Sequence, residues 1–178
     1  ENLKLTVEQV SKEMGKLMRD IADSLFNGIP ENIRYEIFEE CLSYENEYLL
    51  KNGANVYDGV EDVFKELNKK YNVFIVSNCQ EGYLRTFLEY YDFNKYVLDY
   101  EEAGRTGMPK DENIRLVIKR NHLDKAFYVG DTLGDMESTD KAGIPFIHAA
   151  YGFGTVPADR MKINNIKELP EFIDDLLS

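Results

Sequence analysis

Residues 127–135 read FYVGDTLGD. An apolar run of aromatic and β-branched residues stops at Gly130, and two carboxylates follow at Asp131 and Asp135. A short apolar run that is bounded by glycine is typical of a buried strand, and Asp135 comes about one helical turn after Asp131. The stretch therefore predicts a buried strand that leads into a helix, with Asp131 at the point where the strand ends.

The same alternation of apolar runs and helical patterns extends over residues 57–178. Strands are expected at 71–78, 96–100, 125–131 and 144–150, and helices at 58–70, 81–91, 111–120 and 133–141. A short stretch at 161–166 and a final helix to Leu177 follow. Apolar strands that are separated by helices indicate a parallel sheet with both faces covered. The fold class expected is α/β, a Rossmann-like, doubly wound parallel sheet.

The first part of the chain has a different pattern. In residues 6–26, TVEQVSKEMGKLMRDIADSLF, apolar residues recur at intervals of three and four, which predicts one amphipathic helix. Thr6 and Gln9 form a capping-box pattern at its start. A second helix is expected over residues 31–52 and ends at Gly53. We therefore expect a helical cap domain over residues 1–56 and an α/β core domain over residues 57–178.

Composition and net charge argue against some classes of binding partner. The 178 residues are 43% hydrophobic and 30% charged, which is typical of a globular protein, and the net charge of −12 argues against nucleic acid and anionic membrane as partners. The two cysteines, Cys41 and Cys79, have no metal-type spacing. No signal-like start or long apolar run is present, so a cytoplasmic protein is expected. Nothing in the composition indicates an oligomeric state.

Polar residues follow two of the expected strands directly. Val76 leads into Ser77 and Asn78, and Val129 leads into Gly130 and Asp131. In open parallel sheets the ligand binds beyond the carboxyl ends of the strands. Carboxylate oxygens at this place suit Mg²⁺, which uses one or two protein carboxylates beside a substrate phosphate. The alternative is structural: Asp131 as a helix N-cap and Asp135 as a first-turn acid.

Taken in order, these segments resemble the haloacid dehalogenase-like (HAD) superfamily of hydrolases, and within it the phosphoglycolate phosphatase-like members. FIVSN at residues 74–78 is similar to the second family motif, and GDTLGDMESTDKAG at 130–143 is similar to the fourth. GRTGMPKDENI at 104–114 is similar to the third, which supplies a basic residue. The resemblance covers about residues 57–154, and the two leading helices fit the family's cap.

The resemblance implies a role for each matching residue. The Ser77 hydroxyl and the Asn78 amide would bind the phosphoryl group, and Lys110, with Arg105 as a rival, would neutralise charge. Asp131 would ligate Mg²⁺, and Asp135 would bind it directly or through water. The substrate would be a small phosphorylated molecule. Two cations of the cap would bind its distal group: Lys16 and Arg19.

One family motif has no match. The nucleophile is the first Asp of an Asp-x-Asp motif that ends the central strand, and no Asp-x-Asp occurs in the 178 residues. Asp58 precedes a helix and is expected to cap it. We expect that about 20–30 residues are absent upstream of Glu1, so that the middle strand of the sheet is missing and the chain is inactive. An added segment, a strand from another chain or direct pairing of the two neighbouring strands is expected to fill the gap.

Other functions are compatible with the same residues. A phosphosugar mutase of the β-phosphoglucomutase type would share the chemistry, and a non-catalytic module would keep the fold and bind a phosphorylated ligand or a protein. A dehalogenase fits less well, because that branch needs no metal carboxylates. Cys79 is expected to be a small apolar residue, since neither histidine has the context of a base. His148 is expected to be a hydrogen-bonded core residue.

Overall fold

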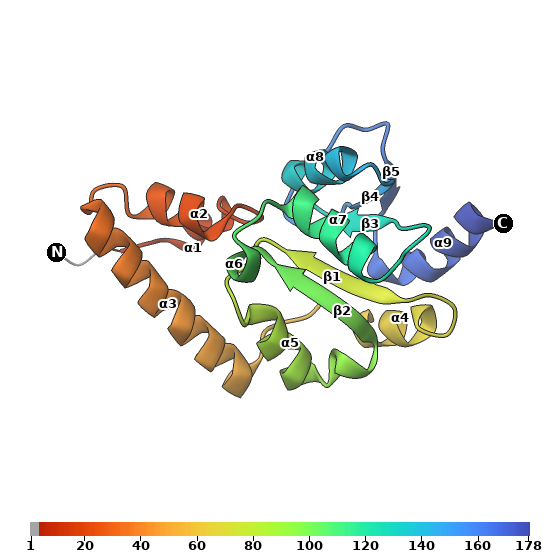
Figure 1. The fold of residues 1–178 in the computed structure, drawn as a ribbon, viewed down its shortest axis with the longest axis horizontal. Coiled ribbons are helices and arrows are strands. Elements are labelled where there is room, and N and C mark those ends of the chain that lie inside the picture. Colours follow the sequence, from red (N-terminus) through yellow and green to blue (C-terminus); the bar gives the residue numbers. More distant parts are fainter. Residues whose placement is uncertain (1–3) are drawn as a thin grey trace.

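The computed structural model describes residues 4–178 and shows an α/β fold. Its first part is helical, with α1 (Val7–Ser11), α2 (Met18–Leu25) and α3 (Glu31–Asn52). The second part alternates, with α4 (Val60–Leu67), β1 (Val73–Ser77), α5 (Tyr83–Tyr91), η1 (Phe93–Lys95), β2 (Val97–Glu102), α6 (Ala103–Thr106), α7 (Lys110–Arg120), β3 (Tyr128–Gly130), α8 (Leu133–Ala142), β4 (Phe146–Ala149), β5 (Met161–Ile163), η2 (Ile166–Glu168) and α9 (Leu169–Leu177). Helices α1–α3 lie to one side of the strands (Figure 1).

All strand pairs are parallel, as the apolar runs predict. β1 pairs with β2, and β3, β4 and β5 form a second sheet in that order. Ser77 lies opposite Glu102 in the first sheet, and Gly130 lies opposite His148 in the second. The carboxyl ends of paired strands therefore meet at one edge, which is where an open parallel sheet binds its ligand.

Helices cover both faces of the strands. All four residues of β4 are buried, although successive side chains of a strand point to opposite faces. Ile147 and Ile163 pack in one cluster with Val63 of α4 and Ile173 of α9. Helices α7 and α8 pack against each other, α7 against β1 and β2, and α8 against β3 and β4. The doubly wound architecture expected from the sequence is confirmed.

A gap separates the two sheets. Within residues 4–178, β1 and β3 are not hydrogen-bonded to each other as strands, and an apolar cavity of about 720 Å³ lies between them. Side chains of β1, β3 and α7 line it, including Val76, Val129 and Val117. The Tyr128 hydroxyl donates to the Val76 carbonyl at 2.8 Å and bridges the two strands. Direct pairing of the two strands, one of the expected ways to close the sheet, does not occur in the described part of the chain.

Two predicted helix features are wrong. Residues 6–26 form two helices, because Gly15 has a φ of +85° and turns the chain between α1 and α2. The capping box of Thr6 and Gln9 is present, but it starts only the short α1. Asp58 caps no helix: α4 begins after Gly59, and the Asp58 carboxylate accepts from Lys167 at 2.5 Å. The boundaries of α3 and the strand positions agree with the sequence pattern.

Gly53 ends α3 and allows the chain to pass closely against α5. Its φ is +68°, and an added Cβ would lie 2.2 Å from Cε1 of Tyr90. Gly53→Ala should therefore lower the free energy of unfolding by about 1–3 kcal/mol, through backbone strain and contact with the ring. Thermal denaturation measures the change, expected as a fall in Tm of about 2–4 °C per kcal/mol.

Gly28→Ala is the matched control. Gly28 has no heavy atom within 4 Å of an added Cβ, and its φ is not in the left-handed region. This variant should unfold at the temperature of the wild type. Equal Tm values for the wild type and the Gly53→Ala variant would show that this junction is not sterically constrained.

Candidate active site

The ends of β1 and β3 meet at one residue of the helical part. The Asn78 side-chain amide donates to the Gly15 carbonyl at 2.8 Å. An added Cβ on the same Gly15 would lie 3.0 Å from the Thr132 side chain, so the Gly15 backbone is packed against Thr132. Because Asn78 directly follows β1 and Thr132 nearly follows β3, both strand ends lie against the α1–α2 loop, and the space at these strand ends is the candidate crevice.

Asp131 is held by the loop that follows β4. The Phe153 backbone amide donates to Asp131 Oδ2 at 2.6 Å. A Cβ added to Gly152 would lie 2.3 Å from the Asp131 side chain. A Cβ added to Gly154 would lie 2.6 Å from the Asp131 carbonyl oxygen. Only glycine allows the loop to approach so closely. The loop therefore fixes one carboxylate oxygen of Asp131, while Oδ1 has no hydrogen-bond partner within residues 4–178.

Asp135 has both oxygens occupied by donors from the chain. Oδ2 accepts from the Asp131 amide at 3.2 Å, from the Thr132 amide at 3.0 Å and from the Thr132 hydroxyl at 2.8 Å. Oδ1 accepts from the Lys110 ammonium. Thr132 is the N-cap of α8, and Asp135 completes its capping box. Within the described chain, Asp135 is 4% exposed and fastens the turn after β3.

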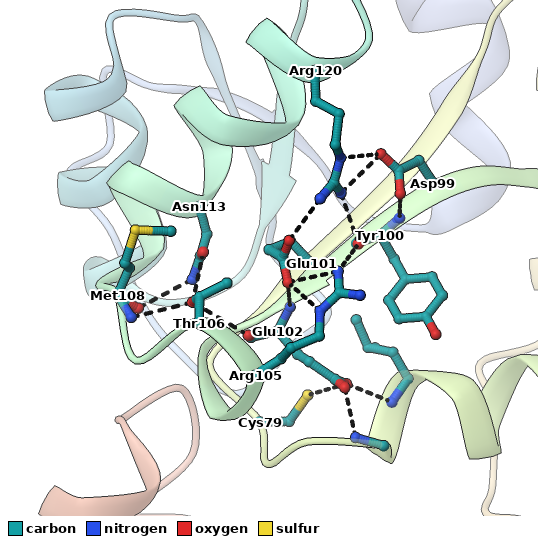
Figure 2. Close-up of polar contacts among 12 residues, drawn as sticks. Cys79, Asp99, Tyr100, Glu101, Glu102, Arg105, Thr106, Met108, Asn113 and Arg120 are labelled. Carbon is teal, nitrogen blue, oxygen red and sulfur yellow. Dashed lines mark hydrogen bonds and ion pairs between the residues drawn. The ribbon is translucent and has the colours of Figure 1, made fainter.

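Lys110 is the basic residue that the structure brings to this crevice. It begins α7, is 8% exposed and forms a buried ion pair with Asp135. Arg105, the rival candidate, points elsewhere: its guanidinium binds Glu101 Oε1 at 2.8–2.9 Å and lies over the Tyr100 ring (Figure 2). The positive charge beside the β3 turn therefore comes from Lys110.

The two charges stabilise each other against burial. Burial favours the neutral forms, yet the neighbours Tyr128 and Asp135 raise the pKa of Lys110, and the charge and hydrogen bond of Lys110 lower the pKa of Asp135. Since folding lowers the pKa of Asp135, this carboxylate stabilises the fold above the pKa that it has in the unfolded chain. The contribution is lost as the pH falls through its lower folded-state pKa.

Ser77 ends β1, and its hydroxyl accepts from the Cys79 amide at 3.2 Å. Its neighbour Asn78 donates to Gly15, and the Asn78 Oδ1 atom is buried with no hydrogen-bond partner in the described chain. Both polar groups lie at the β1 end of the crevice. Asn78 Oδ1 is therefore an unsatisfied acceptor that solvent does not reach.

The two cap cations differ in position. Lys16 follows Gly15, pairs with Glu13 at 2.6 Å and keeps its side chain half exposed. Arg19 donates to the Tyr35 hydroxyl at 3.0 Å and pairs with Glu31 at 3.3 Å. Both partners of Arg19 belong to α3, and among residues 4–178 Arg19 makes no polar contact with the strand ends.

Two further residues near the strands have no catalytic geometry. Burial raises the pKa of the Cys79 thiol to about 12, so it is not a thiolate at neutral pH. His148 is buried in β4 and stacks on Phe146, as expected of a core residue. The expected hydrogen bond is wrong: within residues 4–178 the His148 side chain makes none, and its buried Nε2 atom has no partner.

The residues present fit part of a Mg²⁺ site. Within residues 4–178, no three His, Cys, Asp or Glu side chains gather closely enough to hold a metal ion. Mg²⁺ needs only one or two protein carboxylates and completes its octahedron with water and phosphate oxygen. Asp131 Oδ1 meets this requirement, whereas Asp135 would have to release an internal donor to bind metal directly.

Sequence reasoning missed three contributors to this crevice. Gly15 joins the two strand ends, Thr132 caps α8, and the segment Tyr151–Gly154 holds Asp131. The only sequence signal for the last was the Gly-x-Gly spacing of YGFG directly after an apolar strand. The sequence pattern places Gly15 inside a helix, and no local pattern shows that its carbonyl is an acceptor.

Comparisons with known structures show the same fold. A haloacid dehalogenase-like family hydrolase from Streptococcus pneumoniae matches with a TM-score of 0.80 at 16% identity, over 96% of this chain and 82% of the other. A predicted phosphatase from Clostridium acetobutylicum matches with 0.77 at 20% identity, over 97% and 83%. A predicted phosphoglycolate phosphatase from Haemophilus somnus matches with 0.78 at 15% identity, over 97% and 84%. No curated protein matched the chain.

The sequence itself matches a family model. Residues 1–149 match the model described as haloacid dehalogenase-like hydrolase, which covers most of the chain. In the described part of the chain, no helix is long and apolar enough to cross a membrane. The parallel strands, the crevice at their carboxyl ends and this match agree, and the chain belongs to the haloacid dehalogenase-like hydrolase family.

Proposed function

We propose that the crevice is the phosphate site of a Mg²⁺-dependent phosphatase that acts on a small phosphorylated metabolite. The observation that supports this most directly is the convergence of three groups: Ser77 at the end of β1, Asp131 at the end of β3, and Lys110 beside the β3 turn. A hydroxyl, a free carboxylate oxygen and a cation around one crevice suit a phosphate and its metal.

Each group has a distinct task. The Ser77 hydroxyl donates to a phosphoryl oxygen, since its own oxygen already accepts from Cys79. Lys110 lowers the energy of negative charge that develops on the transferring group, because it acts in a buried site. Asp131 Oδ1 would hold Mg²⁺, and Asp135 would bind it through water. The bound Mg²⁺ would neutralise charge on the phosphoryl oxygens.

The attacking carboxylate would come from a further strand. The cavity between β1 and β3 is apolar and flanked by two parallel strand edges, which is the environment of a central parallel strand. Such a strand, ending in Asp-x-Asp, would place its first carboxylate at the crevice. That carboxylate would form an aspartyl-phosphate, and the second Asp would protonate the leaving group.

The helical part would select the substrate. We assign residues 1–56 as a cap domain and residues 57–178 as the core, although residues 1–3 lie outside the described chain. Gly15 already contacts both strand ends, and Lys16 beside it carries a half-exposed cation. Lys16 and Asn78 are therefore the candidates to bind the rest of the substrate. Arg19 becomes a candidate only if it leaves its partners on α3.

A second function has one observation in its favour. No Asp-x-Asp occurs in the 178 residues, and a protein with the remaining groups would bind a phosphorylated ligand without cleaving it. The turnover experiment below separates this non-catalytic module from the phosphatase.

The metal assignment predicts a difference between the two acidic residues. Asp131→Asn should weaken Mg²⁺ binding by at least about tenfold, because the free carboxylate oxygen loses its charge. Its free energy of unfolding should change by less than about 1 kcal/mol, since the side chain is nearly isosteric. Calorimetric titration with Mg²⁺ and chemical denaturation measure the two effects.

Asp135→Asn is the matched control and should affect the free energy of unfolding more than the affinity for Mg²⁺. It leaves Lys110 buried without its partner, so the free energy of unfolding should fall by about 3–5 kcal/mol, with a smaller loss of Mg²⁺ affinity in the folded fraction. Equal Mg²⁺ affinities for the wild type and the Asp131→Asn variant would contradict the assignment.

The strand assignment predicts that the 178-residue chain does not turn over p-nitrophenyl phosphate with Mg²⁺. Fusing an apolar strand that ends in Asp-x-Asp ahead of residue 1 should restore hydrolysis. It should also raise Tm by at least about 5–10 °C, since relieving even one or two buried unpaired backbone groups removes a cost of roughly 1–3 kcal/mol each.

The matched control carries the same strand ending in Asn-x-Asn. It should gain the thermal stability and not the hydrolysis, which separates filling of the cavity from supply of the nucleophile. Robust Mg²⁺-dependent hydrolysis by the unmodified chain would show that the nucleophile lies elsewhere.

A further inference from the structure

A buried carboxylate at the end of β2 holds the loop that follows Ser77. Glu102 is 2% exposed, and Figure 2 shows its carboxylate at the start of α5. Oε1 accepts from the Gly82 amide at 2.5 Å, and Oε2 accepts from the Leu84 amide at 3.1 Å. The Cys79 thiol donates to Oε2 at 3.8 Å. One side chain thus binds both ends of the segment 79–84.

These contacts replace a missing helix cap. Helix α5 begins after Gly82, which has a φ of +85° and no side chain to accept the first amides of the helix. Unpaired amides at a helix start carry partial positive charge and need an acceptor. Glu102 supplies it from a neighbouring strand, so the position of α5 and of the loop before it depends on β2.

A second contact, from the segment that follows β2, also holds the loop of residues 79–84. The Gly104 amide donates to the Cys79 carbonyl at 2.9 Å. An added Cβ on Gly104 would lie 2.2 Å from the Glu81 nitrogen and 2.6 Å from Cα of Gln80. The backbone of residues 79–81 therefore rests directly on the segment after β2, and a larger residue at position 104 would displace it.

The loop in turn orients Ser77. The Ser77 hydroxyl oxygen accepts from the Cys79 amide, so a shift of Cys79 shifts the hydroxyl and frees it to rotate. We propose that Glu102 is a positioning residue that fixes the Ser77 hydroxyl toward the phosphate by holding residues 79–84. This inference rests on the proposed phosphate-binding role of Ser77.

Glu102→Gln tests the proposal with little change in shape. Its Oε1 can still accept one amide, but the NH₂ group cannot accept the other. Amide hydrogen exchange at Gly82 and Leu84 should become faster, and the affinity for inorganic phosphate should fall by about tenfold. The affinity for Mg²⁺, which depends on Asp131, should stay at the wild-type value. A merely structural role would not separate these two affinities.

Glu101→Gln is the matched control. Glu101 is equally buried, at 2% exposed, but it binds Arg105, Arg120 and the Glu102 backbone amide, and within residues 4–178 it accepts no hydrogen bond from the loop (Figure 2). This variant should lose stability and keep the wild-type affinity for phosphate. Gly104→Ala is a second perturbation of the same loop without any change of charge, and it should reproduce the loss of phosphate affinity.

The outcomes are distinct. Wild-type phosphate affinity in both the Glu102→Gln and the Gly104→Ala variants would overturn the proposal, as would equal losses in the Glu102→Gln and Glu101→Gln variants. If the wild type binds no phosphate, while Glu102→Gln still speeds exchange at Gly82 and Leu84, the restraint on the loop stands and the proposed function fails.

Discussion

The carboxylate of Asp135 accepts four donors in a space where a side chain on Gly130 would not fit. An added Cβ there would lie 2.6 Å from the Asp135 Cβ, and the donors are the Lys110 ammonium, two backbone amides of the β3 turn and the Thr132 hydroxyl. This arrangement joins the start of α7, the end of β3 and the start of α8. Because a buried charge without partners destabilises a fold by several kcal/mol, the turn has little freedom to rearrange.

A second buried carboxylate does the same for the neighbouring strand end. Glu102 lies on β2, opposite Ser77 in the register, and holds the start of the helix that follows β1. In both places an acid accepts the first amides of the turn or helix, where their partial positive charge is greatest. The groups that face the crevice, Ser77 and Asp131, are thereby left with hydrogen-bonding capacity for a ligand.

The features predicted correctly are those that local patterns in the sequence determine. The strand at 71–78 and the Gly130–Asp131 turn are local patterns of apolar run and breaker, and the structure has them where expected. The break between α1 and α2 was missed, because Gly15 turns the chain to meet Asn78 and Thr132, which are distant in sequence. The hydrogen-bond donors to Asp135 were not predicted for a similar reason, because Lys110 comes 25 positions earlier in the sequence. The motif around Asp135 also does not indicate that its carboxylate oxygens already accept hydrogen bonds from the chain.

We propose that the ends of β1 and β3 form one site. The most direct measurement is a titration of the ¹⁵N-labelled chain with inorganic phosphate in the presence of Mg²⁺, followed by the amide chemical shifts. We predict that the amides of Ser77–Cys79 and of Gly130–Thr132 shift together and saturate with a single Kd. Shifts confined to one strand end, or two ends that saturate with different Kd values, would contradict it.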